Sequence, residues 1–359
     1  MILGRRAIAA LVLSAAVFLI ASCRSAQPGV AAASCDNASL TAHPALLVLA
    51  PHPDDETLGF AGLIDAYARA GKPVTVVVVT DGDAYCEACR FWKNGSVVTG
   101  AMCSGEELAS FAAVRRSESE SAAKILGGPT PRFLRYPDTG LAAALKSSAP
   151  LRRSDFSSCA SCDACGYGEG AQTTLTADTL MASLRELIAE QPKGALIATT
   201  HWLDGHPDHA ALGNFVRRVN GESASPHAIA YAVIHAHTKN TANADCWYPA
   251  PAAPDCPCMN EEARALADPQ WLARNANARL QPSQPAALPS DAEYGEVKQL
   301  CLPDRLYAGD DAIKLRAVRA YESQRGRAKR ADALTGIIDC NGYLTSFVRS
   351  TEQFVVINP

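Results

Sequence analysis

The chain has 359 residues, a formal net charge of −4, 48% hydrophobic residues and 19% charged residues. These fractions are ordinary for a globular protein, and a chain of this length forms one large α/β domain or two smaller domains. The net charge is weakly acidic, and the sequence has no basic patch interleaved with aromatic residues. Nothing in the charge distribution therefore indicates binding to nucleic acid.

The N-terminal 22 residues are predicted to be an export signal rather than part of the fold. Arg5 and Arg6 precede an apolar run over residues 8–20, which is shorter than an ordinary membrane span. The run ends in Ile20-Ala-Ser-Cys23, which resembles a bacterial lipobox, so we expect cleavage before Cys23 and lipidation of its thiol. A simple signal peptide, in which Cys23 is incidental, is the alternative.

The mature chain is expected to begin with a linker and to continue as a single domain. Residues 23–43 are rich in Ala and Ser and predict a flexible tether. Residues 44–359 are expected to form one domain, because no Gly/Ser-rich or Pro-rich linker separates the two motifs described below. The lipid would hold this domain at a membrane of the bacterial cell envelope, on the periplasmic face or at the cell surface.

The sequence contains thirteen cysteines, which export would place in an oxidising compartment. With Cys23 lipidated, twelve remain, and disulfides are then the default expectation. The spacings Cys86-x-x-Cys89 and Cys159-x-x-Cys162-x-x-Cys165 leave a zinc site or an iron–sulfur cluster as the alternative. The sequence does not determine which cysteines pair.

The first elements predicted within the domain are a buried strand and a helix joined by a tight link. Residues 46–50 are continuously apolar, as expected for a strand buried on both faces of a parallel sheet, and the helical pattern that follows ends at Gly71. The link lies at the carboxyl end of the strand, where ligands bind in open α/β sheets. It carries His52, Asp54, Asp55 and Glu56. Imidazole and carboxylate groups in this position suit a zinc ion. Alternatively, Asp54 or Asp55 only caps the helix that follows, and the His-Pro pair only forms a turn.

Two more strands and a helix are predicted before the chain midpoint. Residues 73–80 and 131–136 are strand candidates, and the helical pattern resumes between them at Phe111. Arg115 lies on that helix. Arg115 either forms a solvated ion pair with Glu118, three residues further along the helix, or its side chain reaches the substrate.

A second polar loop follows the strand predicted at residues 195–199. It contains His206-Pro-Asp-His209 and opens onto another helical stretch. Two loops that carry imidazoles and carboxylates, each at a strand end, can meet at one edge of a sheet. A further strand is predicted at residues 228–234.

Together, Pro51-His-Pro-Asp-Asp-Glu56 and His206-Pro-Asp-His209 resemble the zinc-dependent PIG-L/LmbE-like N-acetylglucosaminyl deacetylases. Tyr321-Glu-Ser-Gln324 and Glu352-Gln-Phe354 resemble weaker C-terminal signatures of the same family. The resemblance implies an α/β fold, a three-layer Rossmann-like sandwich with a mostly parallel central sheet. Cysteine-rich loop insertions are expected near residues 83–108, 149–172 and 238–311.

The resemblance also implies roles for individual residues. The ligands of a catalytic Zn²⁺ would be His52, Asp55 and His209. Asp54 would be the general base and then the general acid, while His206, as an imidazolium, would donate a hydrogen bond to the oxyanion.

Other polar residues near the motifs receive supporting roles from the same resemblance. Arg115 is expected to bind substrate hydroxyls or a phosphate, and Asp138 to bind substrate hydroxyls or to orient Arg115. Asp208 and Glu56 are expected to orient imidazoles or to cap helices.

The expected reaction is hydrolysis of the acetamide of an N-acetylated small molecule or glycan, such as an amino-sugar conjugate. One alternative is a zinc amidase that acts on another acyl-amide, peptide-like or a secondary metabolite. The other is a non-catalytic surface lipoprotein with a binding or redox role. The intact set of five His and Asp residues argues against this last alternative, since a binding protein needs neither a base nor an oxyanion donor.

Overall fold

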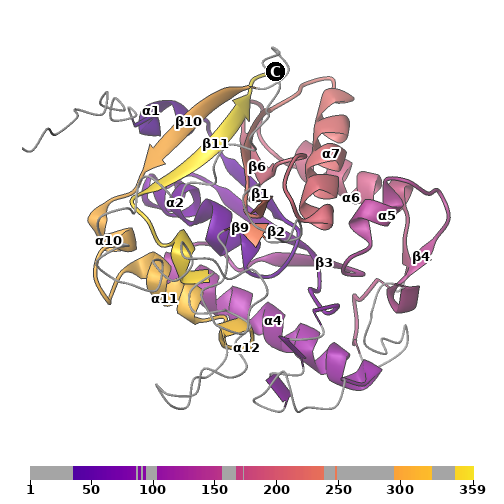
Figure 1. Cartoon of the computed structure of the whole chain (residues 1–359). Coiled ribbons are helices and arrows are strands. Elements are labelled where there is room, and N and C mark those ends of the chain that lie inside the picture. The colour runs from indigo at the N-terminus through magenta and orange to yellow at the C-terminus, as the bar shows by residue number, and fades with distance from the viewer. Residues whose placement is uncertain are drawn as a thin grey trace, which may run out of the picture. The chain divides into compact units, whose positions relative to one another are not determined.

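The structure, a computed structural model, describes residues 35–85, 88–89, 92–93, 103–155, 167–172, 174–237, 247–248, 295–325 and 344–359 (Figure 1). The export signal predicted for residues 1–22, the expected lipidation site Cys23 and the tether up to residue 34 lie outside this part. From Cys35 to Pro359 the chain belongs to one compact unit. Among the described residues, no helix has both the length and the apolar character needed to cross a membrane.

A seven-stranded sheet forms the centre of the described structure, in the order β10-β11-β7-β6-β1-β2-β3 (Figure 1). Antiparallel β10 (Glu296–Cys301) and β11 (Thr351–Ile357) form one edge. The remaining strands are parallel, namely β1 (Leu46–Ala50), β2 (Val74–Thr80), β3 (Arg132–Tyr136), β6 (Leu196–Thr200) and β7 (Ala228–Ala232). The α/β fold with a mostly parallel sheet is therefore confirmed.

The central strand β1 explains why the sequence shows a continuous apolar run instead of an alternating one. Leu47 and Leu49 pack into the hydrophobic cluster on one face of the sheet. Leu46 and Val48 pack into the cluster on the other face. Both faces are covered, so every position of the strand is buried.

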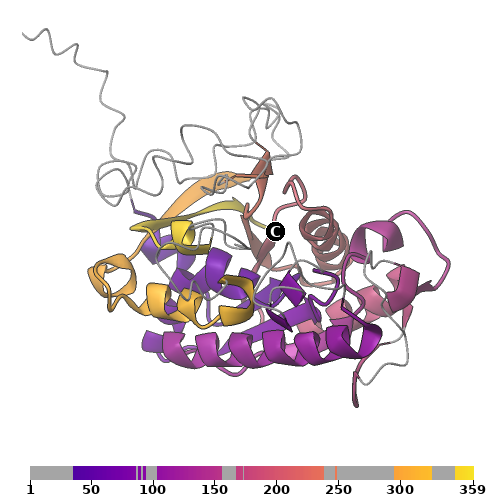
Figure 2. The same cartoon turned by 60° about the horizontal axis from the view of Figure 1, so that its bottom comes forward.

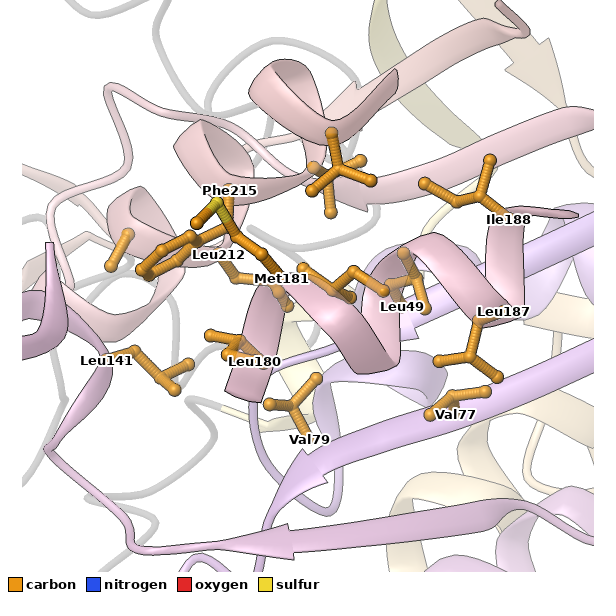
Figure 3. Close-up of a cluster of buried hydrophobic side chains, with 14 of the residues drawn as sticks. Leu49, Val77, Val79, Leu141, Leu180, Met181, Leu187, Ile188, Leu212 and Phe215 are labelled. Atoms are coloured by element: carbon orange, nitrogen blue, oxygen red, sulfur yellow. The ribbon is translucent and has the colours of Figure 1, made fainter. Parts of the chain in front are cut away.

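Helices α6 (Ala177–Ala189) and α7 (Pro207–Gly221) and the short α5 (Leu141–Ala144) cover one face. In Figure 3, leucine and methionine side chains of α6 and Leu212 and Phe215 of α7 lie over strands β1 and β2. Helix α6 carries its apolar side chains on one stripe, which faces the sheet.

On the opposite face, α2 (Asp55–Arg69) packs directly on the sheet. Helices α4 (Gly105–Leu126) and α11 (Ile313–Arg319) cover α2 (Figures 1 and 2). The short helices α10 (Asp304–Tyr307) and α12 (Glu322–Arg325) flank α11 in the chain. The sheet and its two helical layers form the expected three-layer sandwich.

The strand order reverses direction between β1 and β6, which are neighbours although residues 51–195 separate them in the chain. The β1–α2–β2 and β6–α7–β7 crossovers place their helices on opposite faces of the sheet. This is the topological switch point at which open α/β sheets bind ligands.

Three segments differ from what the sequence predicts. Helix α4 begins at Gly105, inside the expected insertion, because Ser104 and Glu107 form a capping box. Strand β10 and helix α10 lie within the expected insertion at residues 238–311. Strand β10 lies at an edge of the sheet, and its polar residues Glu296, Lys298 and Gln299 do not alternate regularly with apolar ones, so the strand signal was weak.

The third difference is at the start of the unit, where residues 35–43 are not a free tether. Helix α1 (Asn37–Leu40) is attached to β10, because the side-chain amide of Asn37 accepts from the backbone N–H of Cys301 and donates to its carbonyl. A disulfide also joins Cys35 to Cys301.

All four cysteines in the described residues form disulfides, Cys35–Cys301 and Cys89–Cys103. The nine others, including Cys23, Cys86 and the cluster at positions 159, 162 and 165, lie outside the described residues.

The disulfide between Cys35 and Cys301 joins positions 266 residues apart. Replacing both cysteines with serine should lower the free energy of unfolding by about 2–5 kcal/mol, because the unfolded chain gains entropy when a long loop opens. Denaturant unfolding measures the change. The matched pair, Cys89→Ser with Cys103→Ser, opens a span of only 14 residues and should cost less. An unchanged unfolding midpoint in the first variant would contradict the expectation.

Candidate metal centre

The two polar loops identified in the sequence meet at one edge of the sheet. Strand β1 pairs in parallel with β6, from Leu46 opposite Leu196 to Leu49 opposite Thr199. The carboxyl ends of both strands therefore lie side by side. The turn before α2 follows β1, and the loop before α7 follows β6.

Three potential ligand atoms from these loops form a nearly equilateral triangle. Asp55 Oδ2 lies 3.1 Å from His52 Nδ1 and 3.1 Å from His209 Nε2, and the two nitrogens are 3.2 Å apart. All three side chains are buried. A tetrahedral zinc ion with bonds of about 2.0–2.2 Å holds its ligand atoms roughly 3.3–3.6 Å apart. The donor set and its spacing therefore fit a zinc ion after small outward shifts.

Each imidazole has a carboxylate close to the nitrogen that faces away from the triangle. His52 Nε2 lies 3.0 Å from Asp138 Oδ1 and 3.6 Å from Asp208 Oδ2. His209 Nδ1 lies 3.5 Å from Asp204 Oδ1. Carboxylates in these positions favour a proton on the outer nitrogen, which leaves the inner lone pair for a cation.

The surrounding carboxylates make the site strongly attractive to positive charge. Although burial favours a neutral ring, Asp55 and Asp204 raise the pKa of His209 to about 9. Asp138 in the same way holds the pKa of His52 well above its usual range, against the effect of burial. The triangle thus stabilises a cation, either a proton or a metal ion that takes its place.

Asp54 lies beside the triangle and outside it. Its φ is 137°, a strained backbone conformation for a residue with a side chain. Burial and the charge of Asp55 raise the pKa of Asp54 to about 8, while Arg115, with Nη2 3.6 Å from its Oδ2, opposes this shift. A cation bound at the triangle would add to the effect of Arg115 and favour the ionised carboxylate.

His206 caps α7 and also faces the triangle. Its ring centroid lies 4.9 Å from that of His52 and 4.8 Å from that of His209. The backbone N–H of Asp208 donates to its Nδ1 at 3.2 Å, so the ring proton lies on Nε2. Burial and the charges of His209 and His52 lower the pKa of His206. In this structure the favoured form of His206 is thus the neutral ring with its proton on Nε2, and its role as an oxyanion donor stays a prediction.

The substrate-binding roles expected for Arg115 and Asp138 stay predictions, and the structure shows what both side chains contact within the protein. Arg115 is only 3% exposed and donates to the carbonyls of Gly82 at 2.6 Å and Pro53 at 2.8 Å. Asp138 faces His52 and accepts from the backbone N–H of Ala84 at 3.0 Å. Arg115 thus contacts the turn through its two Nη atoms, and Asp138 contacts the first imidazole.

Sequence reasoning gave no role to two residues that complete the site. Asp204 accepts from the backbone N–H groups of His206, Ile234 and His235, in addition to facing His209. His235 follows β7 and lies close enough to Asp55 and His209 for the three to share a metal ion. Neither residue belongs to a recognised motif. The sequence feature that could have identified them is their position after a predicted strand.

Comparison with known proteins places this site in a family. The family model of the GlcNAc-PI de-N-acetylase, PIG-L, matches residues 47–220, a span that contains the triangle, Asp54 and His206. Residues 47–220 form a PIG-L family domain. The resemblance inferred from the two motifs is confirmed.

Curated relatives of this PIG-L domain carry the name 1D-myo-inositol 2-acetamido-2-deoxy-alpha-D-glucopyranoside deacetylase. The one from Actinosynnema mirum is 35% identical over 121 residues, which cover 31% of this chain and 38% of the relative. The one from Thermobifida fusca is 24% identical over 242 residues, 66% of each chain. The chain therefore spans 38% of the length of the first of these relatives and 66% of the length of the second.

Two solved structures are similar at low identity. N,N'-diacetylchitobiose deacetylase from Pyrococcus horikoshii has a TM-score of 0.44 at 16% identity, covering 88% of this chain and 84% of that chain. A zinc-inhibited form of a teicoplanin deacetylase has a TM-score of 0.47 at 17% identity, covering 88% of this chain and 98% of that chain.

Asp138 should control metal affinity through His52 without touching the metal. Replacing Asp138 with alanine should weaken zinc binding about 10- to 100-fold, because His52 loses the carboxylate that fixes its orientation. Competition with a chromophoric chelator measures the affinity. The control is Asp65→Ala, which removes a buried carboxylate paired with Arg305, away from the triangle. Equal affinities in Asp138→Ala and wild type would show that His52 needs no such support.

Proposed function

We propose that the protein is a zinc-dependent N-deacetylase that hydrolyses the acetamide of an N-acetylated sugar or amino-sugar conjugate. The triangle of His52, Asp55 and His209 atoms, with Asp54 beside it in a PIG-L domain, carries this proposal. The names of the curated relatives, which specify a 2-acetamido sugar, support the substrate class.

The metal site has the composition that hydrolytic zinc enzymes use. Two neutral imidazoles and one carboxylate would hold the ion and leave a position open. Bound there, zinc supplies a Lewis acid that polarises the acetyl carbonyl and lowers the pKa of water. Asp138 and Asp204 keep the two rings oriented toward that position.

Asp54 moves the proton. As a carboxylate it accepts a proton from the attacking water, and it then returns that proton to the nitrogen of the leaving amine. Asp54 precedes the ligand Asp55 at the start of α2, so the base lies at the edge of the metal site. Its backbone N–H donates to Glu56 Oε2 at 2.9 Å, which fixes the base relative to the ligand.

His206 stabilises the charge that develops on the acetyl oxygen. Because its Nδ1 accepts from the backbone, the ring proton lies on Nε2, which is the donor in this proposal. A neutral donor serves this role and avoids placing a third positive charge beside the metal. Collapse of the tetrahedral species then releases acetate and the free amine.

Metal content and acetate release separate the roles of base and ligand. Asp54→Ala should retain zinc but lose about 100-fold or more in kcat, because no other carboxylate replaces the base. His209→Ala should lose both zinc and activity, because it removes one of the three ligands. The assay measures acetate from a panel of N-acetyl sugars and other acyl-amides, with zinc content determined on the same samples.

Three results would count against the proposal. Full activity in Asp54→Ala would refute the assigned base. Full zinc content in His209→Ala would refute the assigned ligand. Acetate or another acid released only from compounds without a sugar would refute the substrate class and favour a different amidase.

We also propose that the protein is exported and held at a membrane through a lipid on Cys23. The lipobox-like sequence supports the lipid, and the two disulfides among the described residues suit an oxidising compartment. Cys23→Ser should move the protein from the membrane fraction of the expressing cells to the soluble fraction, because one cysteine carries the attachment. Retention of this variant in the membrane fraction would contradict the proposal.

A further inference from the structure

A segment outside the matched family region reaches the turn that carries Asp54. Tyr321 lies between α11 and α12, beyond the match that ends at residue 220. Figures 1 and 2 show both short helices along α4, on the side of the sheet covered by α2. Tyr321 is fully buried there.

The hydroxyl of Tyr321 is part of a continuous hydrogen-bond chain to Glu56. It donates to Glu56 Oε1 at 2.7 Å, and the hydroxyl of Thr57, 2.8 Å away, donates to it in turn because Tyr321 has a single proton to give. Ser119 Oγ donates to the same carboxylate oxygen at 2.5 Å. Two hydroxyl groups from distant parts of the chain therefore fix one oxygen of Glu56.

The other oxygen of Glu56 fixes the base. Glu56 Oε2 accepts from the backbone N–H of Asp54 at 2.9 Å, and this is the residue with φ 137°. A non-glycine residue in such a conformation costs roughly 1–3 kcal/mol and persists only where its surroundings hold it. Gln324 adds a second contact, donating from Nε2 to the carbonyl of Pro53 at 3.2 Å.

We propose that Tyr321 is a positioning residue for the base: its hydroxyl orients Glu56, and Glu56 holds Asp54 in its strained conformation. The inference rests on the proposed function in that it takes Asp54 as the proton acceptor. The hydrogen bonds of Tyr321 within the described residues go to Glu56 and Thr57, and neither of these is a proposed zinc ligand or the base. Loss of Tyr321 should therefore affect the chemical step rather than zinc binding or substrate binding.

Tyr321→Phe removes the hydroxyl and keeps the ring in its packing against Leu58, Ala61 and Val318. We expect kcat to fall about 10- to 100-fold, as for a catalytic group displaced by about an ångström, with KM and zinc content unchanged. The matched control is Tyr67→Phe. Tyr67 is also fully buried, and its hydroxyl donates to the carbonyl of Leu40 at 2.8 Å, away from the site. This control should retain the wild-type kcat.

A double variant tests whether Tyr321 acts through Glu56. In Glu56→Gln, one oxygen becomes an amide donor, so the side chain no longer accepts on both sides. Adding Tyr321→Phe to Glu56→Gln should cost no further activity. Multiplied losses in the double variant would show that the two residues act independently and would overturn the inference.

Amide hydrogen exchange gives a readout that needs no substrate. The Asp54 amide should exchange faster in Tyr321→Phe than in wild type, while Tyr67→Phe leaves it unchanged. Unchanged protection in Tyr321→Phe, an unchanged kcat, or a kcat loss accompanied by loss of zinc would overturn the inference. If the wild-type protein released no acetate from any substrate, the proposed function would fail, and the exchange of this amide would still decide the role of Tyr321.

Discussion

The parallel pairing of β1 with β6 is the contact on which the site depends. It brings the turn that carries His52 beside the first turn of α7, which carries His209, although the two histidines are 157 positions apart in the sequence. The pairing is rigid because both strands are buried on both faces. A one-residue slip between the strands would move one loop by about 3.3 Å, as large as the whole spacing between the ligand atoms.

Negative charge, rather than the three ligands alone, gives the site its preference for a cation. Asp138, Asp204 and Asp208 surround the two imidazoles, and all three are buried. Carboxylates without a positive partner would be costly at such depth, so a cation at the triangle relieves the cost of burying them. The same charges favour a proton on each outer nitrogen, which leaves the inner lone pairs to bind a cation.

The sequence predicted the local elements and the meeting of the two polar loops, but it missed individual tertiary contacts around the site. Continuous apolar runs located β1 and β6, and the motifs placed the potential ligands between the ends of these strands and the first turns of the helices that follow. Nothing local shows that Asp138, at the end of β3, faces His52, since that depends on the strand order. The contact between Tyr321 and Glu56, 265 residues apart, is likewise tertiary. Edge strand β10, with few apolar residues, lacks the pattern of a buried strand.

The position of the metal tests the central claim most directly. Crystals of the protein prepared with zinc, measured on both sides of the zinc absorption edge, would locate the ion by its anomalous signal. The account predicts one peak within bonding distance of His52 Nδ1, Asp55 Oδ2 and His209 Nε2, with Asp54 unbound beside it. A strong zinc peak elsewhere, with these three atoms not bound to any ion, would contradict it.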